Sequence, residues 1–157
     1  MEECIINSPL GYTKIIGDED GICSISVLNS EEKITSIIPE TLEDCAIQLQ
    51  EYFKGERQQF DLKLNPEGTD FQKQVWKQLE QIPFGKTISY LELSRILGNE
   101  KAIRAVANAN SKNPLWILVP CHRVIGSDGS LTGYAGGLHR KQWLLEHESS
   151  FKQLSLF

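Results

Sequence analysis

The sequence lacks long hydrophobic runs. Hydrophobic residues make up 40% of its 157 positions, and no apolar segment approaches the length of about 18 residues that a membrane-spanning helix needs. The first residues also lack the basic stretch and apolar segment of a secretory signal. We therefore expect a soluble, cytoplasmic chain with no membrane partner, large enough for one domain or two small ones.

Cysteine and histidine are scarce as well. The four cysteines are scattered and form no C-x-x-C pair, and the three histidines all lie after residue 121. This spacing is typical neither of a disulfide framework nor of a zinc ribbon. We expect reduced thiols, no bound metal and no cofactor.

Positive charge is lacking overall but not locally. The formal net charge is −5, yet residues 1–85 carry a net charge of −9 and residues 86–157 a net charge of +4. Only the C-terminal half could therefore suit a nucleic acid, although chance unevenness on a solvated surface would look the same.

The N-terminal part has the pattern of a small α/β unit. Residues 5–38 are rich in Ile, Val and Thr and are broken by glycine-containing turns, which predicts a meander of short antiparallel strands. After Pro39 the apolar residues recur at helical spacing as far as Phe53, and Gly55 supplies a stop. The polar segment 56–68 follows, so we place one domain at 1–66 and a second at 67–157.

The second domain is predicted to be mostly helical, which makes the fold class α+β. A helix capped by Thr69 or Asp70 would bury Phe71, Val75, Leu79 and Ile82. Ser89 and Glu92 have capping-box spacing and open a short helix that Gly98 ends.

Asn99 would cap the next helix, which would bury Ile103, Val106 and Ala107 and give a winged-helix-like helix-turn-helix. The apolar run 115–119 is typical of a buried strand, residues 126–130 of a turn, and residues 138–147 of a last helix.

Cys121 is the candidate nucleophile. His122 and Arg123 follow it directly, and both can lower a thiol pKa from its reference value of about 8.5. Pro120 stiffens the backbone in front of it. A buried, inert cysteine remains the alternative reading, because adjacency in sequence does not place two side chains within hydrogen-bond reach.

Several motifs in order carry a resemblance to a known family. They are Ser89-Tyr90, Arg104-Ala105-Val106, Asn113-Pro114, Pro120-Cys121-His122-Arg123-Val124, Gly133-Tyr134-Ala135-Gly136-Gly137-Leu138 and Trp143-Leu144-Leu145-Glu146-His147-Glu148. Over about residues 69–148 the chain resembles the O6-alkylguanine-DNA alkyltransferases. Residues 1–68 resemble that family's N-terminal domain more weakly.

The resemblance implies a DNA repair protein that moves an alkyl group from guanine O6 irreversibly to its own Cys121. In the family a Cys-His-Glu relay activates the sulfur, which carries over to Cys121, to His122 acting through a water, and to Glu148 orienting the imidazole. Tyr90 would donate to guanine N3 as negative charge develops. O4-alkylthymine stays open as a second substrate.

The same resemblance implies a base-binding pocket. The carbonyls of Cys121 and Val124 would read the exocyclic amine, and the backbone N–H of Ala135, next to Tyr134, would meet O6. Asn113 would brace the turn between the recognition helix and the active-site segment.

Duplex DNA containing alkylated guanine is the implied partner of a monomeric protein, with residues 67–157 as its DNA-binding alkyltransferase domain. The target base must be flipped out of the duplex, and Arg104, followed by the small Ala105, falls where the family places the arginine that fills the gap. Phosphate contacts are expected from Lys101, Lys112, Arg95 or Arg123. For Arg123 a structural role, paired with a carboxylate, remains open.

Two other functions fit parts of the pattern. A non-catalytic module that senses alkylated DNA would not need Cys121. A hydrolase with a Cys-His-Glu relay would need an oxyanion hole and would turn over repeatedly.

Overall fold

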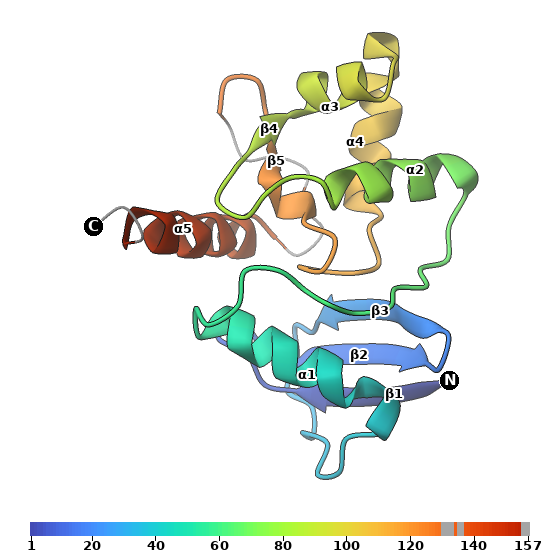
Figure 1. The fold of residues 1–157 in the computed structure, drawn as a ribbon, viewed down its shortest axis with the longest axis vertical. Coiled ribbons are helices and arrows are strands. Elements are labelled where there is room, and N and C mark those ends of the chain that lie inside the picture. The colour runs from blue at the N-terminus through green and yellow to red at the C-terminus, as the bar shows by residue number, and fades with distance from the viewer. Residues whose placement is uncertain (130–133, 135–136, 155–157) are drawn as a thin grey trace. The chain divides into compact units, whose positions relative to one another are not determined.

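The computed structural model describes residues 1–129, 134 and 137–154, with side chains up to residue 149. It consists of two compact units, shown in Figure 1. Unit 1 comprises Met1–Glu67 together with Pro114–Trp116, and unit 2 comprises Gly68–Asn113 and Ile117–Phe157. A short segment from the middle of the C-terminal half thus belongs to the N-terminal unit.

Unit 1 is an antiparallel sheet covered by one helix. Its strands β1 (Glu2–Ile6), β2 (Thr13–Asp18) and β3 (Gly21–Val27) pair in sequence order. Helix α1 (Glu40–Phe53) packs on β1 and β2 (Figure 1). Because unit 2 is mostly helical, the predicted α+β class is confirmed.

Helix α1 follows its sequence pattern closely. Its buried apolar residues are Leu42, Cys45, Ala46, Leu49 and Tyr52. These positions recur at helical spacing, so they form one stripe that faces the sheet. The helix ends where Gly55 adopts a φ of 79°, a conformation that glycine enters at little cost.

Unit 2 begins with helix α2 (Asp70–Leu79), and Thr69 caps it in a capping box with Gln72. The predicted apolar face was wrong in one position, because Phe71 is 38% exposed and Trp76 is buried instead. The Trp76 indole Nε1–H donates to Ala109 O over 2.8 Å. This hydrogen bond satisfies a buried indole donor and fixes which side of α2 faces the core.

The helix-turn-helix consists of α3 (Tyr90–Ile96), the 3₁₀ turn η1 (Glu100–Ala102) and α4 (Ile103–Ser111). Ser89 caps α3 in the predicted box with Glu92. Asn99 caps η1 rather than α4 itself. In α4 the buried residues are Val106, Ala109 and Asn110, so the predicted stripe was correct only at Val106.

The expected buried strand at residues 115–119 does not form. The segment is buried, but only Leu115 makes a bridge, to Ile25, and the chain then turns. Ile117 has a φ of 71°, which ends any extended run. Asn113 Nδ2 donates to Val119 O over 2.7 Å and closes this turn. Apolar composition predicted the burial correctly but could not specify the backbone.

The remainder of unit 2 carries the candidate site. A 3₁₀ turn, η2 (Cys121–Arg123), leads into β5 (Val124–Ile125), which pairs in parallel with β4 (Ile88–Ser89). Gly129 N–H donates to Gly126 O and forms the predicted turn. The last helix, α5 (Leu138–Leu154), continues past the predicted end at residue 147. Among the helices described, none is both long and apolar enough to cross a membrane.

Candidate active site

The short β4–β5 ladder brings the candidate residues together. Ser89 pairs with Ile125, so the start of α3 at Tyr90 lies beside the segment that leaves Cys121. Cys121 is 6% exposed and Tyr90 is 9% exposed. The ladder therefore places Tyr90 and Cys121, which are far apart in the sequence, in the same largely buried part of unit 2.

His122 and Glu148 form a buried pair. His122 Nε2 lies 2.7 Å from Glu148 Oε2, and neither side chain is more than 1% exposed. Because a carboxylate only accepts, Nε2 carries the hydrogen and donates, which leaves the lone pair of the neutral ring on Nδ1. His122 Nδ1 has no partner among the residues described.

Arg123 binds the same carboxylate. Its Nε donates to Glu148 Oε1 over 2.8 Å and its Nη2 to Oε2 over 3.0 Å, while Nη1 donates to Ile82 O over 2.7 Å. The guanidinium also lies 5.8 Å from the ring centroid of Phe84. Arg123 is buried, so the expected contact with a DNA phosphate was wrong. The alternative, a structural role in which Arg123 is paired with a carboxylate, is the one observed. This fork–fork pairing is the strong form of an arginine–carboxylate contact.

The charges follow from this geometry. Burial raises the pKa of Glu148, but His122 and Arg123 outweigh burial and hold that pKa below its usual range. Burial lowers the pKa of His122 more than Glu148 raises it. The pair at neutral pH is therefore a neutral imidazole that donates to an ionised carboxylate, so His122 is ready to accept a proton at Nδ1.

The thiol environment differs from the sequence expectation. Burial raises the pKa of Cys121, so the resting group is a thiol. The groups that lower this pKa are Asn113, Lys141 and Tyr134, not the neighbours His122 and Arg123. The expectation failed because His122 is neutral and Arg123 is already paired with Glu148.

Lys141 was missed by the sequence analysis. Its side chain is fully buried, and Nζ donates to Val124 O over 2.6 Å. Nζ also lies 5.8 Å from the Tyr90 ring centroid and 5.9 Å from that of Tyr134. Burial lowers the Lys141 pKa to about 8, and only the thiolate form of Cys121 raises it.

A sequence signal for Lys141 did exist. Lys141, Leu144 and Glu148 are spaced by three and four residues, which places them on one face of α5. All three are buried. A lysine in register with an apolar residue and a candidate catalytic carboxylate indicates an inward-facing charge.

The other pocket residues surround the thiol. Asn113 and Tyr134 both lower the pKa of the Cys121 thiol, which places their polar groups near the sulfur. Val124 is fully buried, and its carbonyl accepts from Lys141. Ala135, whose N–H was expected to meet O6, lies outside the described residues.

The residues expected to contact DNA lie on a different surface. Arg104, Ala105, Lys101 and Lys112 are exposed on or beside α4, and Arg95 is exposed at the end of α3, where it forms an ion pair with Glu100. They gather on the helix-turn-helix, while the proton-transfer groups are buried. A base would have to leave its duplex to reach Cys121.

Comparisons with known proteins decide the family. A model described as 6-O-methylguanine DNA methyltransferase, DNA binding domain, matches residues 70–150, and one described as the ribonuclease-like domain of the same protein matches residues 2–66. A methylated-DNA–protein-cysteine methyltransferase of Methanosarcina acetivorans is 45% identical over 96% of this chain and 99% of its own. The chain belongs to the 6-O-methylguanine DNA methyltransferase family.

Solved structures of family members agree with this fold. Mycobacterium tuberculosis O6-methylguanine methyltransferase matches with a TM-score of 0.85 at 42% identity, covering 95% of this chain and 93% of its own. The crystal structure of Mycobacterium tuberculosis OGT in complex with DNA matches with a TM-score of 0.87 at 42% identity, covering 96% and 94%.

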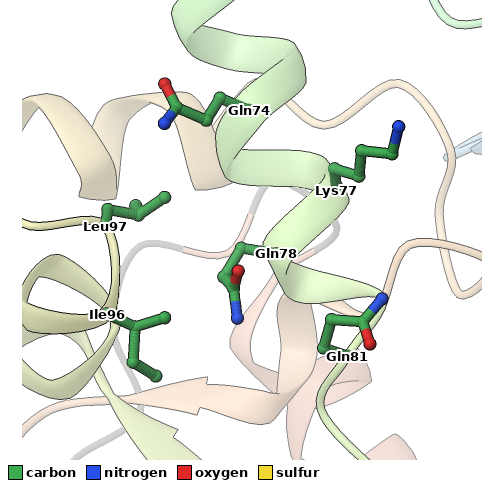
Figure 2. Close-up of a pocket in the computed structure, with 6 residues that line it drawn as sticks. All are labelled: Gln74, Lys77, Gln78, Gln81, Ile96 and Leu97. Atoms are coloured by element: carbon green, nitrogen blue, oxygen red, sulfur yellow. The ribbon is translucent and has the colours of Figure 1, made fainter.

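Two further features of this methyltransferase-family chain do not include the candidate site residues. Figure 2 shows a cavity lined by Gln74, Lys77, Gln78 and Gln81 of α2 and by Ile96 and Leu97 at the end of α3. None of the candidate site residues lines it. The other three cysteines, Cys4, Cys23 and Cys45, are free thiols whose pKa values burial raises, to about 11 for Cys4 and about 12 for Cys45.

Proposed function

We propose that this protein repairs duplex DNA by moving an alkyl group from guanine O6 to its own Cys121, once per molecule. The observation that carries the proposal is the buried relay beside Cys121, in which His122 Nε2 donates to Glu148 over 2.7 Å and leaves Nδ1 as the base. Family membership supports the chemistry, and a family member solved with DNA supports the partner.

The transfer begins with loss of the thiol proton. As substrate binds, Cys121 passes its proton through a water to His122 Nδ1, and Glu148 stabilises the imidazolium that forms. Arg123 keeps Glu148 ionised for this role. A positioned base of this kind accelerates a reaction by on the order of 10²–10⁴-fold.

The sulfur then attacks the alkyl carbon. A sulfur–carbon bond forms as the bond from carbon to O6 breaks, and the electron pair of that bond stays with the guanine. Tyr90 donates its hydroxyl proton to guanine N3, so the base leaves neutral, and the proton on His122 restores the phenol. The product is a thioether on Cys121, which no residue of the site can reverse.

Lys141 supplies positive charge where the thiolate forms. Its ammonium lowers the pKa of Cys121, and burial strengthens that attraction because little water screens it. Asn113 and Tyr134 lower the pKa of the same sulfur as well. The site therefore keeps a neutral thiol at rest and favours ionisation once the proton has an acceptor.

DNA binds to the helix-turn-helix of the domain at 67–157, and the domain at 1–66 is the N-terminal α/β domain. Lys101, Lys112 and Arg95 contact phosphates, while Arg104 fills the gap left by the flipped base, with Ala105 allowing close approach. The carbonyls of Cys121 and Val124 read the exocyclic amine, and the Ala135 N–H meets O6. The protein acts as a cytoplasmic monomer on DNA that contains alkylated guanine.

Stoichiometry tests this function. Incubation with excess duplex containing O6-methylguanine should add one methyl group per protein, on Cys121, as measured by intact and peptide mass spectrometry. Cys121→Ser should accept none. The matched control Cys23→Ser, at the half-exposed free thiol, should keep full stoichiometry.

The same experiment separates the alternatives. Repeated turnover without a modified cysteine would indicate a hydrolase. Tight binding of the modified duplex without transfer would indicate a sensor of alkylated DNA.

A further inference from the structure

Ile117 has a backbone conformation that a β-branched residue rarely adopts. Its φ is 71°, and within residues 1–129, 134 and 137–154 every other residue with a positive φ is a glycine. The side chain is 2% exposed. Isoleucine is strained in this region, because its branched Cβ crowds the backbone, and such strain persists only where the surrounding structure imposes it. The strained residue stands four positions before Cys121, which calls for an explanation.

The segment before Ile117 is fixed to strand β3. Ile25 N–H donates to Pro114 O over 2.8 Å, and Trp116 N–H donates to Ile25 O over 3.2 Å. Leu115 between them is the bridge partner of Ile25. Residues 114–116 belong to unit 1 together with β3. The chain therefore enters Ile117 from a fixed position.

The segment after Ile117 is fixed as well. Asn113 Nδ2 donates to Val119 O over 2.7 Å, and Cys121 N–H donates to the same oxygen over 2.8 Å. Pro120 between them has a φ of −81° and a ψ of 65°, the values of an inverse γ-turn. One carbonyl oxygen therefore connects the Asn113 amide with the backbone of the reactive cysteine.

The turn between these two fixed segments is short. Residues 116–118 form it, and only Ile117 and Leu118 stand between Trp116 and Val119. A positive φ lets a chain reverse within so few residues. Glycine would adopt this conformation at little cost but would also allow others, whereas the Cβ of isoleucine restricts the backbone and its buried side chain anchors the turn. Isoleucine therefore makes the turn strained but rigid.

We propose that Ile117 is a positioning residue whose rigid left-handed turn orients the sulfur of Cys121 toward the alkyl carbon of the flipped base. This inference rests on the proposed function and deepens it. The turn fixes Val119 O, and the γ-turn at Pro120 carries that fixed position to Cys121. Attack on the carbon requires the sulfur close to it and in line with the bond that breaks, and a misplacement of about 1 Å can cost on the order of 10²-fold in rate.

Two variants that both lack the large side chain isolate the backbone. At most positions alanine is more stable than glycine, but at a positive φ the order reverses. Ile117→Gly should therefore melt about 2–4 °C above Ile117→Ala. Ile117→Gly should nevertheless transfer methyl from O6-methylguanine more slowly than Ile117→Ala, by about tenfold or more in single turnover at saturating duplex, because its turn is less rigid. Duplex affinity should be the same for both, since Ile117 is buried away from solvent.

Ile15 provides the matched control. It is a fully buried isoleucine of β2 without a positive φ. Ile15→Ala should melt above Ile15→Gly, and the two should transfer methyl at rates within about twofold of each other. Single-turnover rate constants report the active molecules, so an inactive fraction lowers the amplitude and leaves the rate constant unchanged.

A conservative variant covers the case in which a truncated protein is unfolded. Ile117→Val keeps the branched Cβ and most of the side chain, so it should transfer at about the parent rate, within about twofold. Any truncated variant that is unfolded in buffer is compared in sucrose, which favours the folded state.

The two arms of the test fail separately. Melting of Ile117→Gly below Ile117→Ala, as at Ile15, would overturn the strain. Equal transfer rates for Ile117→Gly and Ile117→Ala would overturn the positioning role. Absence of methyl transfer by the parent protein would instead overturn the proposed function, and the order of the melting temperatures would still report the strain.

Discussion

Replacing Glu148 with glutamine changes a carboxylate that accepts hydrogen bonds from three other residues. The Glu148 carboxylate accepts from His122 Nε2, from two nitrogens of Arg123 and, at 3.4 Å, from Gly85 N–H. Glutamine keeps the shape but turns one acceptor oxygen into an NH₂ donor. At least one donor that faced an oxygen then faces another donor, and the buried Arg123 loses its counter-charge.

The size of the loss follows from burial. Glu148 is 1% exposed and Arg123 is 6% exposed. Removing one partner of a buried ion pair costs about 3–5 kcal/mol, because the other charge remains buried without compensation. For a chain of this length each kcal/mol shifts the melting temperature by about 2–4 °C. We therefore expect Glu148→Gln to melt about 6–20 °C below the parent at pH 7.

Thermal and urea unfolding at pH 7 measure this difference. The control is Glu146→Gln, which makes the same charge change at an exposed position of the same helix and should stay within about 0.5 kcal/mol of the parent. The pKa of Glu148 is lowered in the folded state, so its stabilisation is present above its ordinary value of 4.5 and is lost as the pH falls below it. The gap between parent and Glu148→Gln should accordingly narrow below pH 4.5.

A double variant tests whether the unpaired charge of Arg123 causes the loss of stability in Glu148→Gln. Replacing both partners, as Arg123→Met with Glu148→Leu, removes the orphaned charge and should recover much of the lost stability. Methyl transfer should stay low, because His122 still lacks the carboxylate that orients it. Equal melting of Glu148→Gln and Glu146→Gln would refute the reasoning about this buried pair.

Three further changes test the remaining assignments. Arg104→Ala should slow repair of duplex DNA by about tenfold or more while reaction with a free O6-alkylguanine analogue is unchanged, because only the duplex requires base flipping; equal losses would remove its role. Tyr90→Phe should slow methyl transfer by on the order of 10²-fold, because the leaving guanine loses its proton donor, while duplex affinity in a binding titration stays at the parent value; a loss of affinity instead would contradict a role in the chemical step. Lys141→Met should melt higher than the parent at pH 7, because burial lowers the Lys141 pKa from 10.5 to about 8 and burying the charged form therefore costs the parent stability. The parent should regain this stability as the pH rises from 8 to 10.5. The same variant should react more slowly with iodoacetamide at Cys121, and an unchanged rate would argue against electrostatic support of the thiolate.

Local patterns in the sequence predicted much of the fold. The period of the apolar residues gave α1, and the Ser89–Glu92 box gave the start of α3, because both depend on neighbours a few residues away. The buried strand at 115–119 was wrong for the complementary reason. Apolar composition reports burial, but the left-handed turn at Ile117 depends on contacts with residues distant in the sequence.

The identities of the candidate site residues could likewise be predicted from the sequence, whereas their contacts could not. The resemblance to the alkyltransferases named Cys121, His122 and Glu148 as candidate relay residues, and no geometry was needed for that. Which charges act on the sulfur was not readable from adjacency. Arg123 stands two positions from Cys121 yet is paired with Glu148, whereas Lys141, twenty residues away, lowers the thiol pKa.

The sequence by itself determined the α+β class, the helix-turn-helix and the chemical identity of the candidate residues, because these depend on periodicity, capping and motif order along the chain. Only the tertiary structure decided the protonation of His122, the pairing of Arg123 and the buried charge of Lys141. Each of these depends on how much water is excluded from a group and on which distant atom meets it there, and neither quantity is encoded within a few residues of the group itself.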